Sequence, residues 1–149
     1  MTFDETLAQY DSVFIDTAPI IYYIEAHPQF GSLARRLVET FQAEKLQAYS
    51  SVITLVEVLP KPVELGNRDL AAQFTTFLRN GINLTLLDVT ADIAESAGEL
   101  RGQYPALRGM DAMQIAVALA AKAEAFVTND VRLKQVKAIE VIVLKDYLP

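Results

Sequence analysis

Apolar residues along the chain occur in short runs and at helical intervals, and the two spacings predict different elements. Short runs predict five strands, at residues 13–15, 47–49, 84–87, 125–127 and 141–144. Helical spacing predicts helices from Pro19, over 32–45, over 67–79, from Thr90 to about Arg101, and over 110–122. The last of these is apolar almost all round, so we expect it to be central and buried.

Residues 52–59 fit either kind of element. Their β-branched side chains favour a strand, whereas the cap at Ser50-Ser51 and the stop at Lys61-Pro62 favour a short helix, which is the assignment we adopt. Strands that alternate with helices are typical of an α/β fold. We therefore expect a three-layer α/β/α sandwich with a mostly parallel central sheet, formed by residues 1–149 as one domain.

Composition narrows the class of protein. The chain has 149 residues, of which 52% are hydrophobic, enough to fill the core of one domain. It has no cysteine, which excludes a disulfide framework and a thiolate metal site. The first five residues include two acids and no base, unlike a secretory signal. No apolar stretch approaches the roughly 18 residues that span a bilayer, so we expect a cytoplasmic protein.

Four acids stand at positions that draw attention. Asp16 and Asp130 lie where apolar runs stop, and ligands of an open parallel sheet bind beyond the carboxyl ends of its strands. Asp111 stands at the start of the buried helix, where the helix dipole favours a negative charge. Glu57 interrupts the apolar run 52–59, an expensive position for an unpaired charge.

Each acid also has a structural explanation of its own. Asp16 and Asp111 could cap helices, Asp130 could be a turn residue, and Glu57 could point to solvent. Together they indicate a site, because two carboxylates about 5 Å apart repel by roughly 3 kcal/mol at an effective dielectric near 20. Several in one pocket must protonate or hold a cation.

The chemistry of these groups narrows the choice of cation. An all-oxygen site without histidine or cysteine suits Mg²⁺ or Mn²⁺. Thr17, Thr128 and Asn129 lie beside the acids and supply short polar groups suited to orienting ligands or water. The sequence therefore predicts a divalent metal site.

At these residues the chain resembles the PIN-domain nucleases, especially the toxin subunits of VapBC toxin–antitoxin pairs. The matching segments are Phe14–Thr17, Ser51–Leu59, Met110–Ala116 and Phe126–Asp130. No single segment is specific, whereas their order and spacing together are. The resemblance extends from about residue 13 to residue 144. It implies a parallel-sheet α/β/α fold whose acids bind Mg²⁺ or Mn²⁺ and hydrolyse RNA.

The resemblance also suggests roles and a partner. Asp16 and Asp111 would be the main metal ligands, Asp130 would complete the site, and Glu57 would bind a second metal or orient the attacking water. A small antitoxin would cover the pocket, where an arginine can pair with carboxylates. Its interface is expected between residues 32 and 79, although the same stripes could face the core or a second copy of this chain.

Two features depart from the family pattern. About a dozen residues precede the first strand, and they are expected to form an extra helix. The net charge of −6 lacks the basic footprint of most nucleic-acid enzymes, so RNA must contact a local patch. The candidates for that patch are Arg108, Arg132, Lys134 and Lys137.

Two other functions remain open from the sequence. A phosphoaspartyl phosphatase or a receiver domain would use Asp16 as a nucleophile. Such a phosphatase would need a second aspartate where Ala18 stands, and a receiver would need a lysine where Asn129-Asp130 stands. The other alternative is a PIN-type binding module that has lost activity. The presence of all four acids argues against it.

Overall fold

A single parallel sheet organises the computed structural model, which describes all 149 residues. Its strands are β1 (Ser12–Ile15), β2 (Gln47–Ser51), β3 (Leu84–Leu87), β4 (Ala125–Thr128) and β5 (Glu140–Val143). Their order across the sheet is β3-β2-β1-β4-β5, and every neighbouring pair is parallel. The chain thus starts in the middle, builds outward to β3, and returns to the other side of β1 for β4 and β5. The predicted parallel sheet is confirmed.

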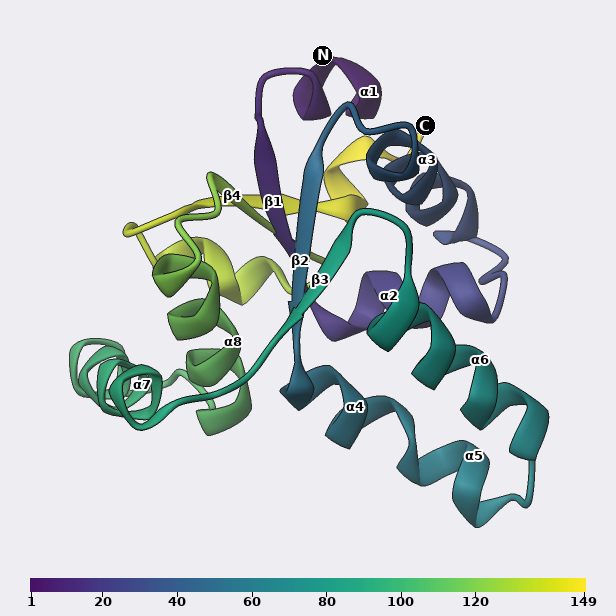
Figure 1. Ribbon diagram of the computed structural model, residues 1–149. Helices are drawn as coiled ribbons and strands as arrows, with labels where there is room; N and C mark the ends of the chain where they lie inside the picture. The colour runs from purple at the N-terminus through teal and green to yellow at the C-terminus, as the bar shows by residue number, and fades with distance from the viewer.

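Helices cover both faces of the sheet (Figure 1). One face packs against α1 (Phe3–Leu7), α2 (Thr17–Ile24), α3 (Gly31–Gln42) and α6 (Arg68–Asn80). The other face packs against α7 (Ala91–Gln103), α8 (Gly109–Ala120) and the 3₁₀ turn η1 (Val131–Gln135). The remaining elements are α4 (Val52–Val58), α5 (Pro60–Glu64) and the 3₁₀ turn η2 (Leu144–Tyr147). The predicted α/β/α layering is confirmed.

Alternation along the strands divides the core in two. Val13 and Ile15 of β1 pack in the cluster beneath α2, α3 and α6, whereas Phe14 points to the α7–α8 face. There it stacks on Phe126 of β4, with the ring centroids 5.3 Å apart.

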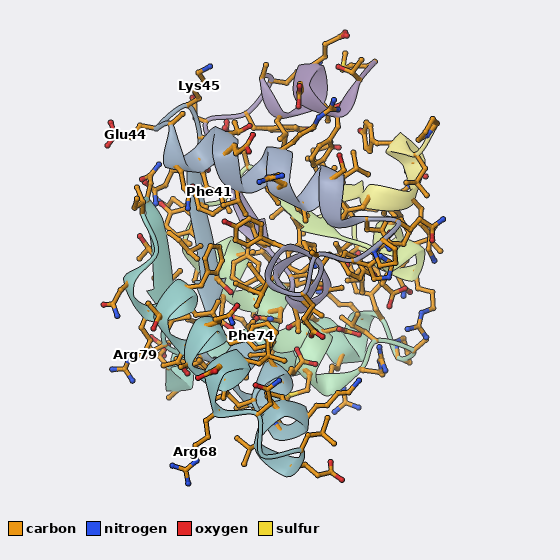
Figure 2. All side chains as sticks on the ribbon, turned by 90° about the vertical axis from the view of Figure 1, so that its right-hand side faces the viewer. Phe41, Glu44, Lys45, Arg68, Phe74 and Arg79 are labelled. Atoms are coloured by element: carbon orange, nitrogen blue, oxygen red, sulfur yellow. The ribbon has the colours of Figure 1, made fainter.

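The cluster on the first face is rich in aromatic side chains. Figure 2 shows Phe41 and Phe74 pointing inward from α3 and α6, while Arg68 and Arg79 project outward from α6. The stripes in the helical region therefore face mainly the core.

The ambiguous segment after β2 is helical. Ser51 ends β2 and caps α4, because its hydroxyl accepts a hydrogen bond from the Ile53 N–H at 3.1 Å. α4 ends at Val58, before Lys61-Pro62 as predicted, but a second short helix that was not predicted, α5, begins at Pro60 and contains both residues. Prolines are tolerated in a first helical turn, where the N–H groups have no partner in the helix. The extra helix expected near the N-terminus is α1, and none of the helices is long and apolar enough to cross a membrane.

Candidate active site

The sheet has its topological switch point between β1 and β4. These strands are neighbours, yet the chain leaves β1 toward β2 and leaves β4 toward β5, so the carboxyl ends of the two strands open a crevice. Asp16 follows β1 directly, and its N–H continues the ladder to the Val127 carbonyl at 2.9 Å. Asp130 lies two residues beyond the end of β4. The two strand-end aspartates therefore meet at the crevice.

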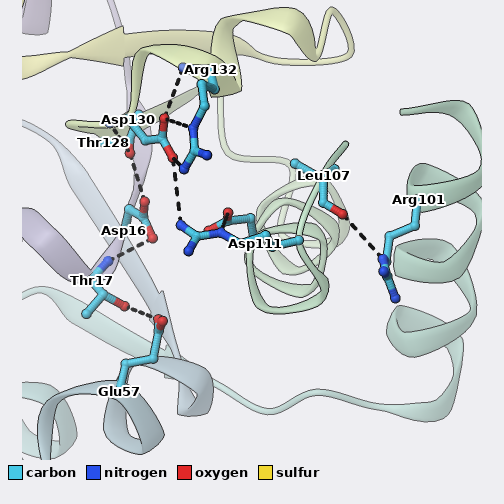
Figure 3. A network of polar contacts seen from close by, with 10 residues as sticks. Asp16, Thr17, Glu57, Arg101, Leu107, Asp111, Thr128, Asp130 and Arg132 are labelled. Atoms are coloured by element: carbon cyan, nitrogen blue, oxygen red, sulfur yellow. Dashed lines mark hydrogen bonds and ion pairs between the residues drawn. The ribbon is translucent and has the colours of Figure 1, made fainter. Parts of the chain in front are cut away.

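Asp16 is held at the bottom of this crevice, with 8% of its surface exposed. Its Oδ1 accepts the Thr17 N–H at 2.8 Å as the cap of α2, and its Oδ2 accepts the Thr128 hydroxyl at 2.8 Å (Figure 3). The pKa of Asp16 is raised to about 6: burial raises it most, the hydrogen bonds from Thr128 and Thr17 lower it, and the negative charges of Asp111 and Glu57 add a smaller rise. This carboxylate is one that a cation would stabilise.

Asp130 is bound by an arginine two residues later. The Arg132 guanidinium donates to both carboxylate oxygens, at 2.9 and 2.7 Å, and the Arg132 N–H donates at 3.0 Å. The hydrogen bonds and charge of Arg132 lower the pKa of Asp130, with a smaller contribution from Arg108. Asp130 is therefore ionised and paired.

A second arginine joins two of the acids. Arg108 precedes α8, and its guanidinium lies 3.3 Å from the Asp111 carboxylate and 4.0 Å from that of Asp130. The loop before α8 is anchored from α7, since Arg101 Nε donates to the Leu107 carbonyl at 3.3 Å. The Arg108 side chain is still 69% exposed, so it is free to change partners.

Glu57 does not occupy the buried position that its sequence surroundings suggested. The segment forms a short helix beyond the carboxyl edge of the sheet, one side of which faces solvent, and Glu57 is exposed there. Of the two alternatives that the sequence left open for Glu57, the structure shows the exposed one. The Glu57 carboxylate accepts the Thr17 hydroxyl at 2.6 Å and so faces the same crevice.

One cavity of about 280 Å³ is lined by all four acids and by the three polar neighbours named from the sequence. Its lining residues are Asp16, Thr17, Ala18, Ile21, Tyr22, Glu57, Arg108, Asp111, Thr128, Asn129 and Asp130. A larger hollow of about 590 Å³ beside His27 and Arg35 has no carboxylate in its lining. The smaller cavity is therefore the candidate active site.

Some predicted residues serve other purposes. The Asn129 amide donates to the Tyr22 hydroxyl at 3.1 Å and accepts the Lys145 N–H at 3.0 Å, so it ties β4 to α2 and to the end of β5. Lys134 pairs with Asp146 at 2.6 Å, and the Lys137 ammonium donates to the Lys134 carbonyl at 3.0 Å. Neither lysine lines the cavity.

Two residues beneath the cavity, Gln114 and Thr54, were not singled out from the sequence. Gln114 is 1% exposed, and its Nε2 donates to the Thr54 hydroxyl at 2.9 Å and to that of Thr17 at 3.4 Å. The available signal was a lone amide in an apolar helix, one turn after Asp111.

The donor set suits a hard divalent cation, since every acid offers carboxylate oxygen and the neighbours offer hydroxyls. In the structure Asp111 and Asp130 are paired with arginines, and no three acids surround a common point. The residues fit Mg²⁺ or Mn²⁺ by chemistry, provided that the arginine pairs exchange for the ion.

Comparison with a family model gives the deciding observation, a match to the PIN domain over residues 13–139. The chain belongs to the PIN domain family. The match favours a nuclease interpretation of this PIN domain over a phosphoaspartyl one. None of the curated proteins compared with it matches.

Solved structures share the fold of this PIN domain. VapBC2 from Rickettsia felis, bound to a DNA fragment from its promoter, matches with a TM-score of 0.72 at 20% identity, over 89% of this chain and 98% of that one. DNA-bound VapBC from Salmonella typhimurium matches with a TM-score of 0.70 at 21% identity, over 89% of this chain and 98% of that one. VapC20 from Mycobacterium tuberculosis, a sarcin–ricin loop cleaving toxin, matches with a TM-score of 0.61 at 19% identity, over 76% of this chain and 86% of that one.

Proposed function

We propose that this PIN domain is a metal-dependent endoribonuclease that acts in the cytoplasm as the toxin of a toxin–antitoxin pair. The observation that carries the proposal is the convergence of Asp16, Glu57, Asp111 and Asp130 from four separate segments on one cavity. The cavity lies at the switch point of a parallel sheet, where such folds bind ligands. The description of the similar VapC20 as a loop-cleaving toxin supports RNA as the substrate.

The acids would hold Mg²⁺ or Mn²⁺, with Asp16 and Asp111 as main ligands and Asp130 completing the site. Such an ion would lower the pKa of a bound water and neutralise charge on the phosphoryl oxygens. Thr17 and Thr128 hold the two oxygens of Asp16 by hydrogen bonds of 2.8 Å each. Glu57 would bind a second ion or orient the attacking water, because its carboxylate lies on the same cavity.

Arg108 and Arg132 are the proposed substrate contacts. In the structure they neutralise Asp111 and Asp130. With these carboxylates engaged by a cation, the Arg108 and Arg132 guanidiniums would be available to a phosphate, which each can bind through two N–H groups at once. Lys134 is the weakest of the predicted contacts, since its ammonium is paired with Asp146 outside the cavity.

The proposed partner is an antitoxin. Another structure with the same fold is a toxin–antitoxin complex from Klebsiella pneumoniae, with a TM-score of 0.66 at 20% identity over 89% of this chain and 97% of that one. Three large apolar side chains near one another in sequence are exposed, namely Val56 at 58%, Val63 at 66% and Leu65 at 70%. They lie on and just after α4 and α5, inside the region 32–79, and they would form the apolar part of the interface.

Incubation of the purified protein with mixed RNA and matched DNA, in Mg²⁺, Mn²⁺ or EDTA, tests the enzymatic part. We expect cleavage of RNA with either ion and none with EDTA or in the variant Asp16→Asn. The products should carry 5′-phosphate and 3′-hydroxyl ends, because water and not the 2′-hydroxyl attacks. Ends bearing 2′,3′-cyclic phosphate would exclude this mechanism, and an inert protein would leave an inactive binding module.

Co-expression with the neighbouring small reading frame tests the biological part. We expect a stable complex that no longer cleaves RNA, and slowed growth when this chain is expressed alone. A chain that cleaves RNA, forms no complex and does not affect growth is a solitary PIN-type nuclease.

A further inference from the structure

Gln114 is a buried amide in a helix whose only other polar side chain is that of Asp111, and only 1% of its surface is exposed. An amide without partners in such a place costs about 1–3 kcal/mol. Here both of its polar atoms are bonded, and the structure has no buried side-chain nitrogen or oxygen without a partner. The partners are hydroxyls of Ser51, Thr54 and Thr17, which belong to β2, α4 and α2.

The donor and acceptor roles in this group follow from its chemistry. The Ser51 oxygen accepts the Ile53 N–H, which leaves its own proton for the Gln114 carbonyl oxygen. The Gln114 amide nitrogen can only donate, so Thr54 and Thr17 accept from it. A hydroxyl has a single proton, and that of Thr17 goes to Glu57 at 2.6 Å. The bonds thus run in one direction, from Gln114 toward Glu57.

Helical spacing gives the Gln114–Thr54 bond a geometric consequence. Gln114 lies three residues after Asp111 on α8, and Thr54 lies three residues before Glu57 on α4. Residues three apart share one face of a helix. The 2.9 Å bond between Gln114 and Thr54 therefore joins the two helices one turn away from the acids that each presents to the cavity.

We infer that Gln114 is a positioning residue, which sets the separation of Glu57 and Asp111 through Thr54 and orients the Glu57 carboxylate through Thr17. The inference rests on the proposed function, because it assigns a role within the same site. Gln114 does not touch the cavity and takes no part in the chemistry. Its loss should lower turnover more than substrate binding, since Arg108 and Arg132, the proposed substrate contacts, lie elsewhere.

The test compares Gln114→Met, which keeps an unbranched chain but cannot hydrogen-bond, with Thr54→Val and Thr54→Ser. For RNA cleavage we expect Gln114→Met and Thr54→Val each to lower kcat about 10- to 100-fold and to change KM by less than about threefold. Thr54→Ser should recover most of the kcat that Thr54→Val loses. Mn²⁺ titration without RNA should show weaker binding in the first two variants only.

A matched control separates positioning from loss of stability. Asn83 donates to the Phe41 and Leu46 carbonyls at 3.0 and 2.9 Å, at the opposite edge of the sheet, so Asn83→Ala removes two bonds without touching the site. The Tm of Asn83→Ala should fall, while its kcat should equal that of the wild-type protein. A kcat of Gln114→Met that equals this control overturns the inference.

The proposed function and this inference can fail separately. If the wild-type protein neither binds Mn²⁺ nor cleaves RNA, the proposed function is refuted. The position of Glu57 is then read from crystal structures of the unchanged chain and Gln114→Met. We expect its carboxylate to leave Thr17 in the variant, and a Glu57 that stays bonded to Thr17 overturns the inference whatever the activity.

Discussion

Asp16 is the acid whose surroundings most oppose its charge. It is 8% exposed, and burial raises its pKa from 3.8 to about 6, a rise worth on the order of 3 kcal/mol. We expect Asp16→Asn to raise the free energy of unfolding at pH 7 by only about 1–2 kcal/mol. The gain is smaller than about 3 kcal/mol because the asparagine amide has one acceptor oxygen for the two donors, the Thr17 N–H and the Thr128 hydroxyl. Urea denaturation measures this, and calorimetry should find Mn²⁺ binding lost. Asp88→Asn, at an exposed position, should change neither quantity.

The same group sets a pH dependence. Between pH 4 and 6 the folded chain holds the Asp16 proton that the unfolded chain has lost, so this group lowers stability as the pH rises through that window and adds no slope above it. Mn²⁺ competes with the proton, so its affinity at pH 5 should be about tenfold below that at pH 7. Equal affinities at the two pH values would contradict a raised pKa.

Individual residues differ in how far the sequence reveals them. Asp16 and Asp130 could be assigned to one edge because apolar runs end there and parallel strands share that edge. The exposure of Glu57 could not, since it depends on where α4 lies relative to the sheet. Nor could the pairing of Arg108 with Asp130, or the contacts of Gln114 with Thr54 and Thr17, because these residues lie more than twenty positions apart in the sequence.

At the scale of elements, local chemistry was sufficient in most cases. The serine cap correctly favoured a helix over a strand for α4, and apolar runs located all five strands to within a few residues. The sequence missed α5, where prolines were interpreted as a stop although they occupy a first turn. The strand order could not be predicted, because β1 pairs with β4 across more than a hundred residues.

Two glycines in or beside helices predict opposite effects of one substitution. Gly98 lies inside α7, where an added Cβ meets no atom within 4 Å, so Gly98→Ala should stabilise the protein by about 0.5–1 kcal/mol. Gly81 follows α6, where a Cβ would overlap the Phe77 carbonyl oxygen, and Gly81→Ala should cost about 1–3 kcal/mol. Thermal unfolding of the pair measures the difference, and a stabilising Gly81→Ala would contradict the packing after α6.

Over the whole molecule, a net charge of −6 limits how RNA can bind. Two arginines beside the cavity predict that the logarithm of RNA affinity falls with the logarithm of salt concentration with a slope of about −1.4, at about −0.7 per phosphate contact for single strands. Arg108→Ala should halve the slope. The control is Arg35→Ala. Arg35 does not line the cavity and pairs with Glu39 at 3.4 Å, so its loss should leave the slope unchanged. Fluorescence anisotropy in the Asp16→Asn background measures both, and a much steeper slope would require a basic surface elsewhere.

The adjacency of β1 and β4 also orders events during synthesis. The segment containing β1, β2 and β3 is translated long before β4, and until β4 is added one edge of β1 has unpaired backbone groups. Asp16 and Asp130 come together only when that edge is filled. The proposed site is therefore incomplete in a growing chain until β4 and the residues just after it have been translated.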